Sequence, residues 1–147
     1  MLNDRMKQEV LKSNNVVSEK SYAFALNVIQ LARVLRKQHE YEIASQLLRC
    51  GTSIGANVEE AQCGVSRTDF AAKMGIASKE ARETHYWLRL VRDSQTLSHD
   101  QVQLRLKEAE ELVRTLTAIV KTSQRTRNLK SNIQHSPFTI THCEGIA

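Results

Sequence analysis

The sequence contains few residues that interrupt regular structure: one proline and five glycines among 147 residues, with aromatic residues at only 5%. A β-sandwich or barrel needs a turn signal about every 8–12 residues, so this scarcity argues against all-β architectures. With 41% hydrophobic and 25% charged residues, the composition is that of an ordinary globular chain. We therefore expect one domain-sized core in an all-α fold.

The three cysteines are an odd set, with no CxxC spacing and no histidine at zinc-ligand spacing: Cys50, Cys63 and Cys143. Neither a disulfide framework nor a metal site is expected, and reduced thiols fit best. No apolar run approaches the roughly 20 residues that cross a bilayer, and the N-terminus lacks the apolar segment of a secretion signal. We expect a cytoplasmic protein without membrane contact, metal or cofactor.

The sequence also lacks the local signatures of common catalytic sites. It contains no GxxxxGK[ST], GxGxxG, HExxH or GxSxG motif, and no glutamate has a histidine three residues later, as di-iron bundles require. His85 follows Glu83 by two residues, which would place their side chains about 200° apart on a helix. We therefore expect no enzymatic activity.

Positive charge exceeds negative charge by five, and the excess is concentrated near the C-terminus. Residues 18–120 are almost neutral, whereas residues 121–147 carry four basic side chains and one acidic side chain. Beyond about Arg125 the apolar periodicity ends, and Pro137 disfavours a continuous helix. The expected organisation is an N-terminal arm at 1–17, a folded bundle at 18–125, and a flexible, basic and polar tail at 126–147.

Apolar residues recur at spacings of three and four in four segments, which predicts four helices. Their expected bounds are Ser18 to about Gln38, Tyr41 to about Gln62, a Ser66 or Thr68 cap to about Asp93, and a Ser98 cap to about Arg125. Short connections make successive helices antiparallel, so we predict an antiparallel up-down-up-down four-helix bundle. Gly51 and Gly55 are expected to allow close approach of a neighbouring helix.

The third predicted helix carries more apolar surface than a single core requires. Beside its core-facing sector lies an adjoining apolar sector formed by Ile76, Trp87 and Leu90. This surplus predicts a second buried contact, and self-association is the simplest explanation. The alternative is that Trp87 covers one end of the core.

A polar network is predicted between the second and third helices, because Glu80 lies within the wide apolar sector and a carboxylate there needs partners. Its members are Gln46, Ser53, Asn57, Glu60, Glu80, Glu83 and Thr84. We expect Asn57 and Ser53 to donate hydrogen bonds to Glu80, and Lys73 or Lys79 to neutralise part of its charge. Such a network can fix the register of two helices. The alternative is a pair of acidic catalysts or metal ligands formed by Glu60 and Glu80.

Two stretches of the sequence resemble a known family. They are QLLRCGTSIGANVEEA at residues 46–61 and IASKEARETHYWL at residues 76–88, with Phe70 between them. The family comprises four-helix-bundle proteins encoded in intervening sequences of bacterial 23S rRNA genes, with a pattern near QLxRxxxSIxxNIxEA, then F, then KExxETxxWL. Val58 in place of isoleucine is the mild departure, and the resemblance covers about residues 22–120.

The resemblance implies an antiparallel four-helix bundle, a homopentameric ring in the members whose assembly is known, and no established catalytic activity. It also relates the chain to accessory proteins of diversity-generating retroelements. Those proteins form similar basic pentamers, bind nucleic acid and partner a reverse transcriptase. A fold transfers more readily than a function along such a resemblance.

The main functional hypothesis is a non-catalytic, oligomeric protein that binds RNA or DNA or serves as a scaffold. Its candidate contacts are Arg33 and Lys37 on the first predicted helix, and Lys79, Arg82, Tyr86 and Arg89 on the third. In the second group, cations flank an aromatic ring that can stack on a base. The alternative interpretation is that these are ordinary solvated faces with glutamate partners.

Two other hypotheses remain open. A small all-α ribonuclease of toxin type would use an Arg–His pair, Arg92 with His99 or Arg33 with His39, for acid–base chemistry and charge stabilisation. A protein-interaction adaptor would receive its partner on outward-facing apolar residues such as Leu26, Val34 and Leu104.

Overall fold

The computed structural model describes residues 4–134, and in that range the chain is all-α, with four helices and no strand. The helices are α1 (Asp4–Lys37), α2 (Tyr41–Gln62), α3 (Arg67–Asp93) and α4 (His99–Gln134). The prediction of an all-α chain with four helices is confirmed. Over the same range, every helix falls short of the continuous apolar length that a bilayer crossing requires.

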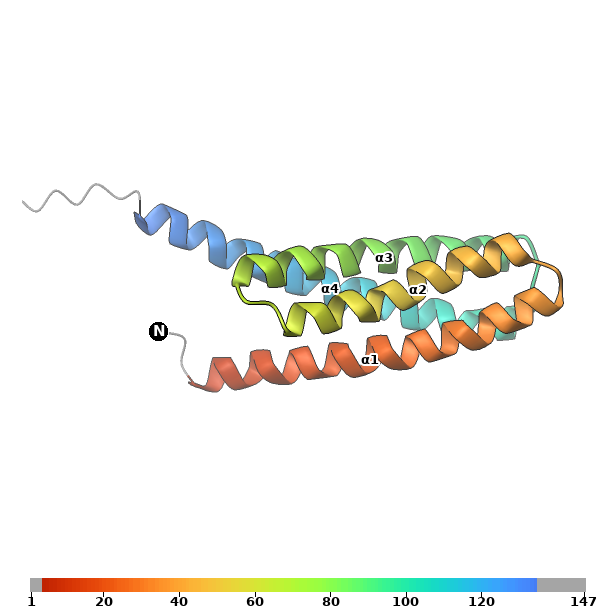
Figure 1. Ribbon diagram of the computed structural model, residues 1–147, viewed down its shortest axis with the longest axis horizontal. Coiled ribbons are helices and arrows are strands. Elements are labelled where there is room, and N and C mark those ends of the chain that lie inside the picture. Colours follow the sequence, from red (N-terminus) through yellow and green to blue (C-terminus); the bar gives the residue numbers. More distant parts are fainter. Residues whose placement is uncertain (1–3, 135–147) are drawn as a thin grey trace, which may run out of the picture.

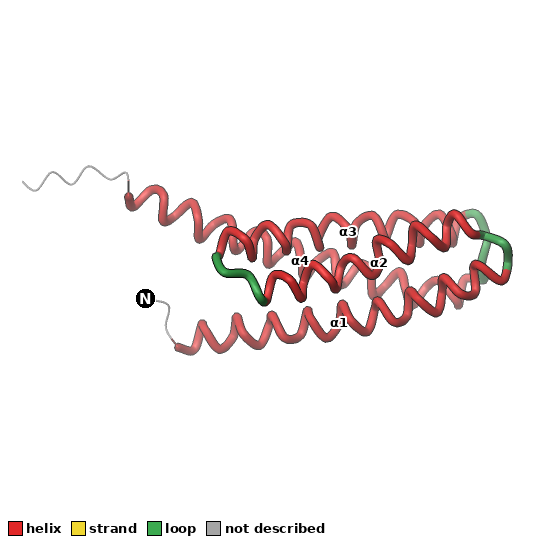
Figure 2. The backbone as a smooth tube through the Cα atoms, viewed as in Figure 1, coloured by secondary structure: helices red, strands yellow, loops and turns green. Residues whose placement is uncertain are grey.

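The four helices lie alongside one another, with their short connections at the two ends (Figure 1). α2 contacts both α1 and α3, and α4 likewise contacts both α3 and α1. Each helix thus occupies one corner of the bundle, and α1 lies diagonally opposite α3. The tube drawn through the backbone doubles back at the loops that join successive helices (Figure 2).

Two helices are longer than predicted. α1 begins at Asp4, so the expected helix start at Ser18 is wrong, and the hydroxyl of Ser18 instead donates a hydrogen bond to Glu59 on α2 (Oγ to Oε1, 2.8 Å). The residues before Val17 are largely exposed, so their sequence shows little apolar periodicity. Local pairs such as Arg5 with Glu9, one turn apart, support that segment instead. α4 continues past Arg125 to Gln134, and the expectations for residues 135–147 lie outside the described residues.

α2 and α3 have the predicted bounds, and the start of α3 is determined by a side-chain cap. Ser66 is the N-cap of α3, and its hydroxyl oxygen accepts a hydrogen bond from the backbone N–H of Asp69 at 3.0 Å. Before α4, the backbone N–H of Ser98 donates to Oε1 of Gln101 at 3.1 Å, the reciprocal half of a capping box.

One hydrophobic core runs through all four helices. Its largest fully buried side chains include Phe24, Leu35, Leu47, Ile54, Met74, Leu88 and Leu116. The close contact predicted at the glycines of α2 is confirmed. A Cβ on Gly51 would lie only 2.7 Å from Cγ1 of Val28 on α1, and a Cβ on Gly55 would lie 3.5 Å from the backbone oxygen of Ser21.

Candidate functional site

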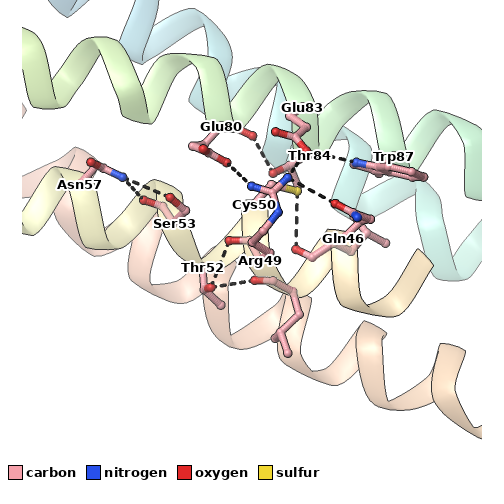
Figure 3. Close-up of polar contacts among 12 residues, drawn as sticks. Gln46, Arg49, Cys50, Thr52, Ser53, Asn57, Glu80, Glu83, Thr84 and Trp87 are labelled. Carbon is pink, nitrogen blue, oxygen red and sulfur yellow. Dashed lines mark hydrogen bonds and ion pairs between the residues drawn. The ribbon is translucent and has the colours of Figure 1, made fainter. Parts of the chain in front are cut away.

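A polar cluster centred on Arg49 joins α2 to α3 (Figure 3). The Arg49 guanidinium forms an ion pair with Glu83, and its Nη1 lies 3.6 Å from Oε2 of Glu80. Nη2 of Arg49 also donates to Oε1 of Gln46 at 3.3 Å, and the indole N–H of Trp87 donates to Oε1 of Glu83 at 3.4 Å. One guanidinium therefore serves two carboxylates, so the cluster carries an excess of negative charge.

Glu80 occupies a partly buried position in this cluster. Its side chain is 19% exposed, and its buried Oε2 has no hydrogen-bond partner. An ion at this depth needs a countercharge, and Arg49 provides it. Sequence reasoning missed Arg49, although its spacing of three from Gln46 and four from Ser53 places it on the same polar stripe of α2.

The partners predicted for Glu80 are replaced by others. The side-chain amide of Asn57 donates to Ser53, to the backbone oxygen at 2.9 Å and to Oγ at 3.1 Å. Lys73 pairs with Glu60, and Lys79 is exposed. A local bond one turn back orders fewer groups than a bond across helices, which explains why Asn57 bonds within α2.

Thr84 and Cys50 form the buried base of the cluster. Thr84 is fully buried, and its hydroxyl donates to the backbone oxygen of Glu80 at 2.8 Å. Burial raises the pKa of the Cys50 thiol, whose S–H donates to the backbone oxygen of Leu47 at 3.7 Å. Cys50 is therefore a protonated packing group rather than a thiolate nucleophile.

The acidic alternative, Glu60 with Glu80, does not assemble as a paired site. Glu60 pairs with Lys73, whereas Glu80 faces Arg49. Within residues 4–134, no three histidine, cysteine, aspartate or glutamate side chains are grouped so that they could hold a metal ion.

A basic surface lies on the α4 side of α3. We call it the α3 basic patch, and it consists of Lys79, Arg82, Tyr86 and Arg89, all exposed. The guanidinium carbon of Arg89 lies 6.0 Å from the centre of the Tyr86 ring, and Nη2 of Arg82 donates to Oγ1 of Thr117 on α4 at 2.9 Å. In the described part of the chain, no carboxylate lies within ion-pair distance of its three cations.

α4 extends this basic surface. Arg114 and Lys121 lie three residues before and four residues after Thr117, on the same stripe of α4, and both are exposed. Sequence reasoning missed them, because the contact between Arg82 and Thr117 that brings this stripe to the patch is a tertiary one. The neighbouring His85 lies across from Glu110, with Nε2 and Oε1 3.4 Å apart.

Arg33 and Lys37 lie on α1, which does not contact α3. The sequence grouped them with the α3 cations as nucleic-acid contacts, but the structure places them at the opposite corner of the bundle. Arg33 donates to Oε1 of Gln30 at 3.4 Å, and both cations are exposed. They therefore form a second charged surface, separate from the α3 basic patch.

The predicted interface residues lie on the α2 side of α3. Ile76 and Leu90 are 42% and 39% exposed. Trp87 is partly buried against the core, and its ring meets that of Tyr86 edge-on at 5.6 Å between centroids. Trp87 thus covers the core, while Ile76 and Leu90 remain available on the surface.

The residues of the two remaining hypotheses are placed as follows. Arg92 makes two hydrogen bonds to Asp93, at 2.7 and 3.1 Å, and these bonds lower the pKa of Asp93. His99 is exposed at the start of α4. Nδ1 of His39 lies 3.0 Å from the hydroxyl of Tyr41.

Of the residues predicted to receive a protein partner, Leu26 and Leu104 are exposed. Val34 packs against the core, so its expected outward position is wrong.

Comparisons with known proteins agree with the motif resemblance. A family model described as 23S rRNA-intervening sequence protein matches residues 13–118. A solved structure from Bacteroides thetaiotaomicron, described as a protein of unknown function from the S23 ribosomal protein family, is 39% identical. That match covers 74% of this chain and 98% of the other, with a TM-score of 0.71. No curated protein matches the sequence.

Proposed function

The chain belongs to the 23S rRNA-intervening sequence protein family, and from that premise we propose that it is a non-catalytic, self-associating protein that binds nucleic acid through the α3 basic patch. The observation that carries the proposal is the arrangement of Lys79, Arg82 and Arg89 around the exposed ring of Tyr86, with no carboxylate within ion-pair distance in the described chain.

This arrangement suits a phosphate backbone with accessible bases. Cations that are not held in ion pairs can neutralise phosphates and release their counterions, which favours binding at low salt. A half-exposed tyrosine, 46% accessible, offers a ring face for base stacking. Arg114 and Lys121 lengthen the basic surface along α4.

Self-association multiplies the patch. We propose an antiparallel up-down-up-down bundle that assembles into a homo-oligomer in the cytoplasm, with the pentamer of related proteins as the working stoichiometry. Several patches on one particle convert weak contacts into stronger multivalent binding. The relation to retroelement accessory proteins makes a reverse transcriptase a candidate protein partner.

The proposal is tested by measuring RNA and DNA affinity over a range of salt concentrations. Replacing Lys79, Arg82 and Arg89 by alanine should weaken binding at least about tenfold and reduce the salt slope by about 2 for single strands. The matched control removes Arg5, Lys7 and Lys12, three exposed cations of α1, and should bind nearly as the wild type. Equal losses in both triple variants would overturn the assignment of the patch.

The non-catalytic part needs a separate assay. RNA incubated with the protein should be recovered intact at every salt concentration. Cleavage that disappears in a His99→Ala variant would contradict the proposal and favour the ribonuclease hypothesis.

A further inference from the structure

We infer that a stripe on α1 of one copy packs against a stripe on α3 of the next copy, in a head-to-tail contact. The inference rests on the self-association proposed above and specifies its two surfaces. The α1 stripe consists of Tyr22, Leu26, Ile29, Arg33 and Lys37. The α3 stripe consists of Ile76, Glu80, Glu83, Trp87 and Leu90.

The α1 stripe faces away from the core. Its members follow one another at spacings of four, three, four and four, on the side of α1 opposite the buried Phe24, Val28 and Leu35. Tyr22 is 64% exposed and Leu26 is 48% exposed. The stripe therefore begins as an apolar ridge and ends with two exposed cations.

The α3 stripe has the complementary character. Its members follow at spacings of four, three, four and three, next to α2, with half-exposed Ile76 and Leu90 at its ends. At its centre, two carboxylates share the single guanidinium of Arg49. This surface thus offers apolar contact and spare negative charge to an incoming helix.

The two patterns match in one antiparallel register. In this register Leu26 lies against Leu90, and Ile29 lies against Trp87. One and two turns further along α1, Arg33 lies against Glu83 and Lys37 lies against Glu80. The spacings are three, four and four on α1 against three, four and three on α3. In a parallel register that pairs the same charges, Ile29 with Ile76 would be the only apolar pair between the two stripes. The matched segments each extend about 15 Å at a rise of 1.5 Å per residue.

The contact joins two different surfaces, so it is heterologous and can close into a ring. α1 and α3 occupy opposite corners of the bundle, and the two stripes of one copy cannot meet each other. The α3 stripe lies on the α2 side, at Arg49, whereas the α3 basic patch lies on the α4 side, at Thr117. The two surfaces adjoin where the rings of Trp87 and Tyr86 meet edge-on. Assembly would leave uncovered Arg82 and Arg89, which lie on the flank of α3 away from the stripe.

The test uses two variants, each of which disables one surface. Arg33→Glu with Lys37→Glu reverses the charge of the α1 stripe. Ile76→Lys with Leu90→Lys places cations on the α3 stripe and leaves its cluster with Arg49 untouched. All four side chains are exposed, so both variants should keep the wild-type helical circular dichroism and melting temperature. The matched control reverses Lys12 and Lys107, two exposed cations outside both stripes.

Mass in solution gives the readout. The wild type and the control should be oligomeric, and each variant alone should be a monomer. A one-to-one mixture of the two variants should form a dimer and nothing larger, because the mixture retains one intact α1 stripe and one intact α3 stripe. A mixture that stays monomeric would overturn the inference, since it indicates a symmetric contact.

Other outcomes separate the inference from the proposal on which it rests. A variant that keeps the wild-type mass overturns the assigned surfaces and leaves self-association standing. A monomeric wild type overturns both. A second measurement on the unaltered protein is zero-length carbodiimide cross-linking, which should join Lys37 to Glu80 between copies. Absence of that linked peptide from a cross-linked oligomer would overturn the antiparallel register.

Discussion

Arg49 on α2 and Glu83 on α3 form an ion pair that links the two helices at the middle of the bundle (Figure 3). The same guanidinium approaches Glu80, whose side chain is only 19% exposed. A single side chain of α2 therefore compensates two acidic side chains of α3.

Replacing Arg49 by alanine should lower the free energy of unfolding by about 1–3 kcal/mol, because it leaves a partly buried carboxylate without a countercharge. Arg49→Lys should be intermediate, since an ammonium cannot serve two carboxylates in the fork geometry of a guanidinium. Urea denaturation measures the difference. Arg92→Ala is the control, because it removes an exposed arginine paired with its neighbour Asp93 and should change little. Equal effects of Arg49→Ala and Arg92→Ala would contradict the structural role of the cluster.

The two glycines of α2 give a matched pair of substitutions. Gly51→Ala gains up to about 1 kcal/mol in helix propensity but forces a Cβ into fully buried Val28, and overpacking costs about 1–3 kcal/mol. We expect a net loss of stability. Gly55→Ala meets only an ordinary 3.5 Å contact with Ser21 and should raise stability by up to about 1 kcal/mol. The melting temperatures should move in opposite directions, and a shared sign would argue against the α1–α2 spacing described here.

Cys50 and Cys63 should differ sharply in reactivity. Burial raises the pKa of the Cys50 thiol, and the side chain is 0% exposed, whereas Cys63 is exposed just beyond the end of α2. Because the thiolate is the nucleophile, iodoacetamide at neutral pH should label Cys63 first and Cys50 only on unfolding. Peptide mass spectrometry assigns each site. Labelling of Cys50 at the rate of Cys63 in the native protein would show that the base of the cluster opens readily.

The parts of the structure that sequence reasoning predicted are those governed by local chemistry. The bounds of α2 and α3 follow from apolar periodicity and, for α3, from the Ser66 cap. The start of α1 was missed because an exposed helical segment has no core-facing pattern to detect.

Contacts between helices were harder to predict. Apolar periodicity correctly predicted that Glu80 faces α2. It could not show that Arg49 rather than Asn57 reaches Glu80, because the rotamer of a long side chain decides which partner it contacts. The sequence likewise combined Arg33 with the α3 cations, since it does not show that α1 and α3 lie on a diagonal.

Stability should depend on pH through Lys20 and Glu111, which bridge α1 and α4. The hydrogen bond from Lys20 lowers the pKa of Glu111. A depressed carboxyl pKa contributes stability above the unfolded-state value, about 4.3, and loses it as the pH falls through the folded-state value. Glu111→Gln should therefore be less stable than the wild type at pH 7, by under about 1 kcal/mol for so exposed a pair. The difference should vanish in acid and shrink at high salt; a difference that persists in acid would assign the effect to packing.

Tyr86 separates stacking from electrostatics in the proposed nucleic-acid contact. Tyr86→Ala should weaken binding to single strands by about 1–3 kcal/mol, the range for loss of one stacked base, whereas Tyr86→Phe keeps the ring and should bind as the wild type. Neither change removes a charge, so the salt slope should be the same in both variants. If Tyr86→Phe lost as much affinity as Tyr86→Ala, the hydroxyl rather than the ring would make the contact. A changed salt slope in Tyr86→Ala would instead show that the ring acts by positioning Arg89, which lies 6.0 Å from its centre.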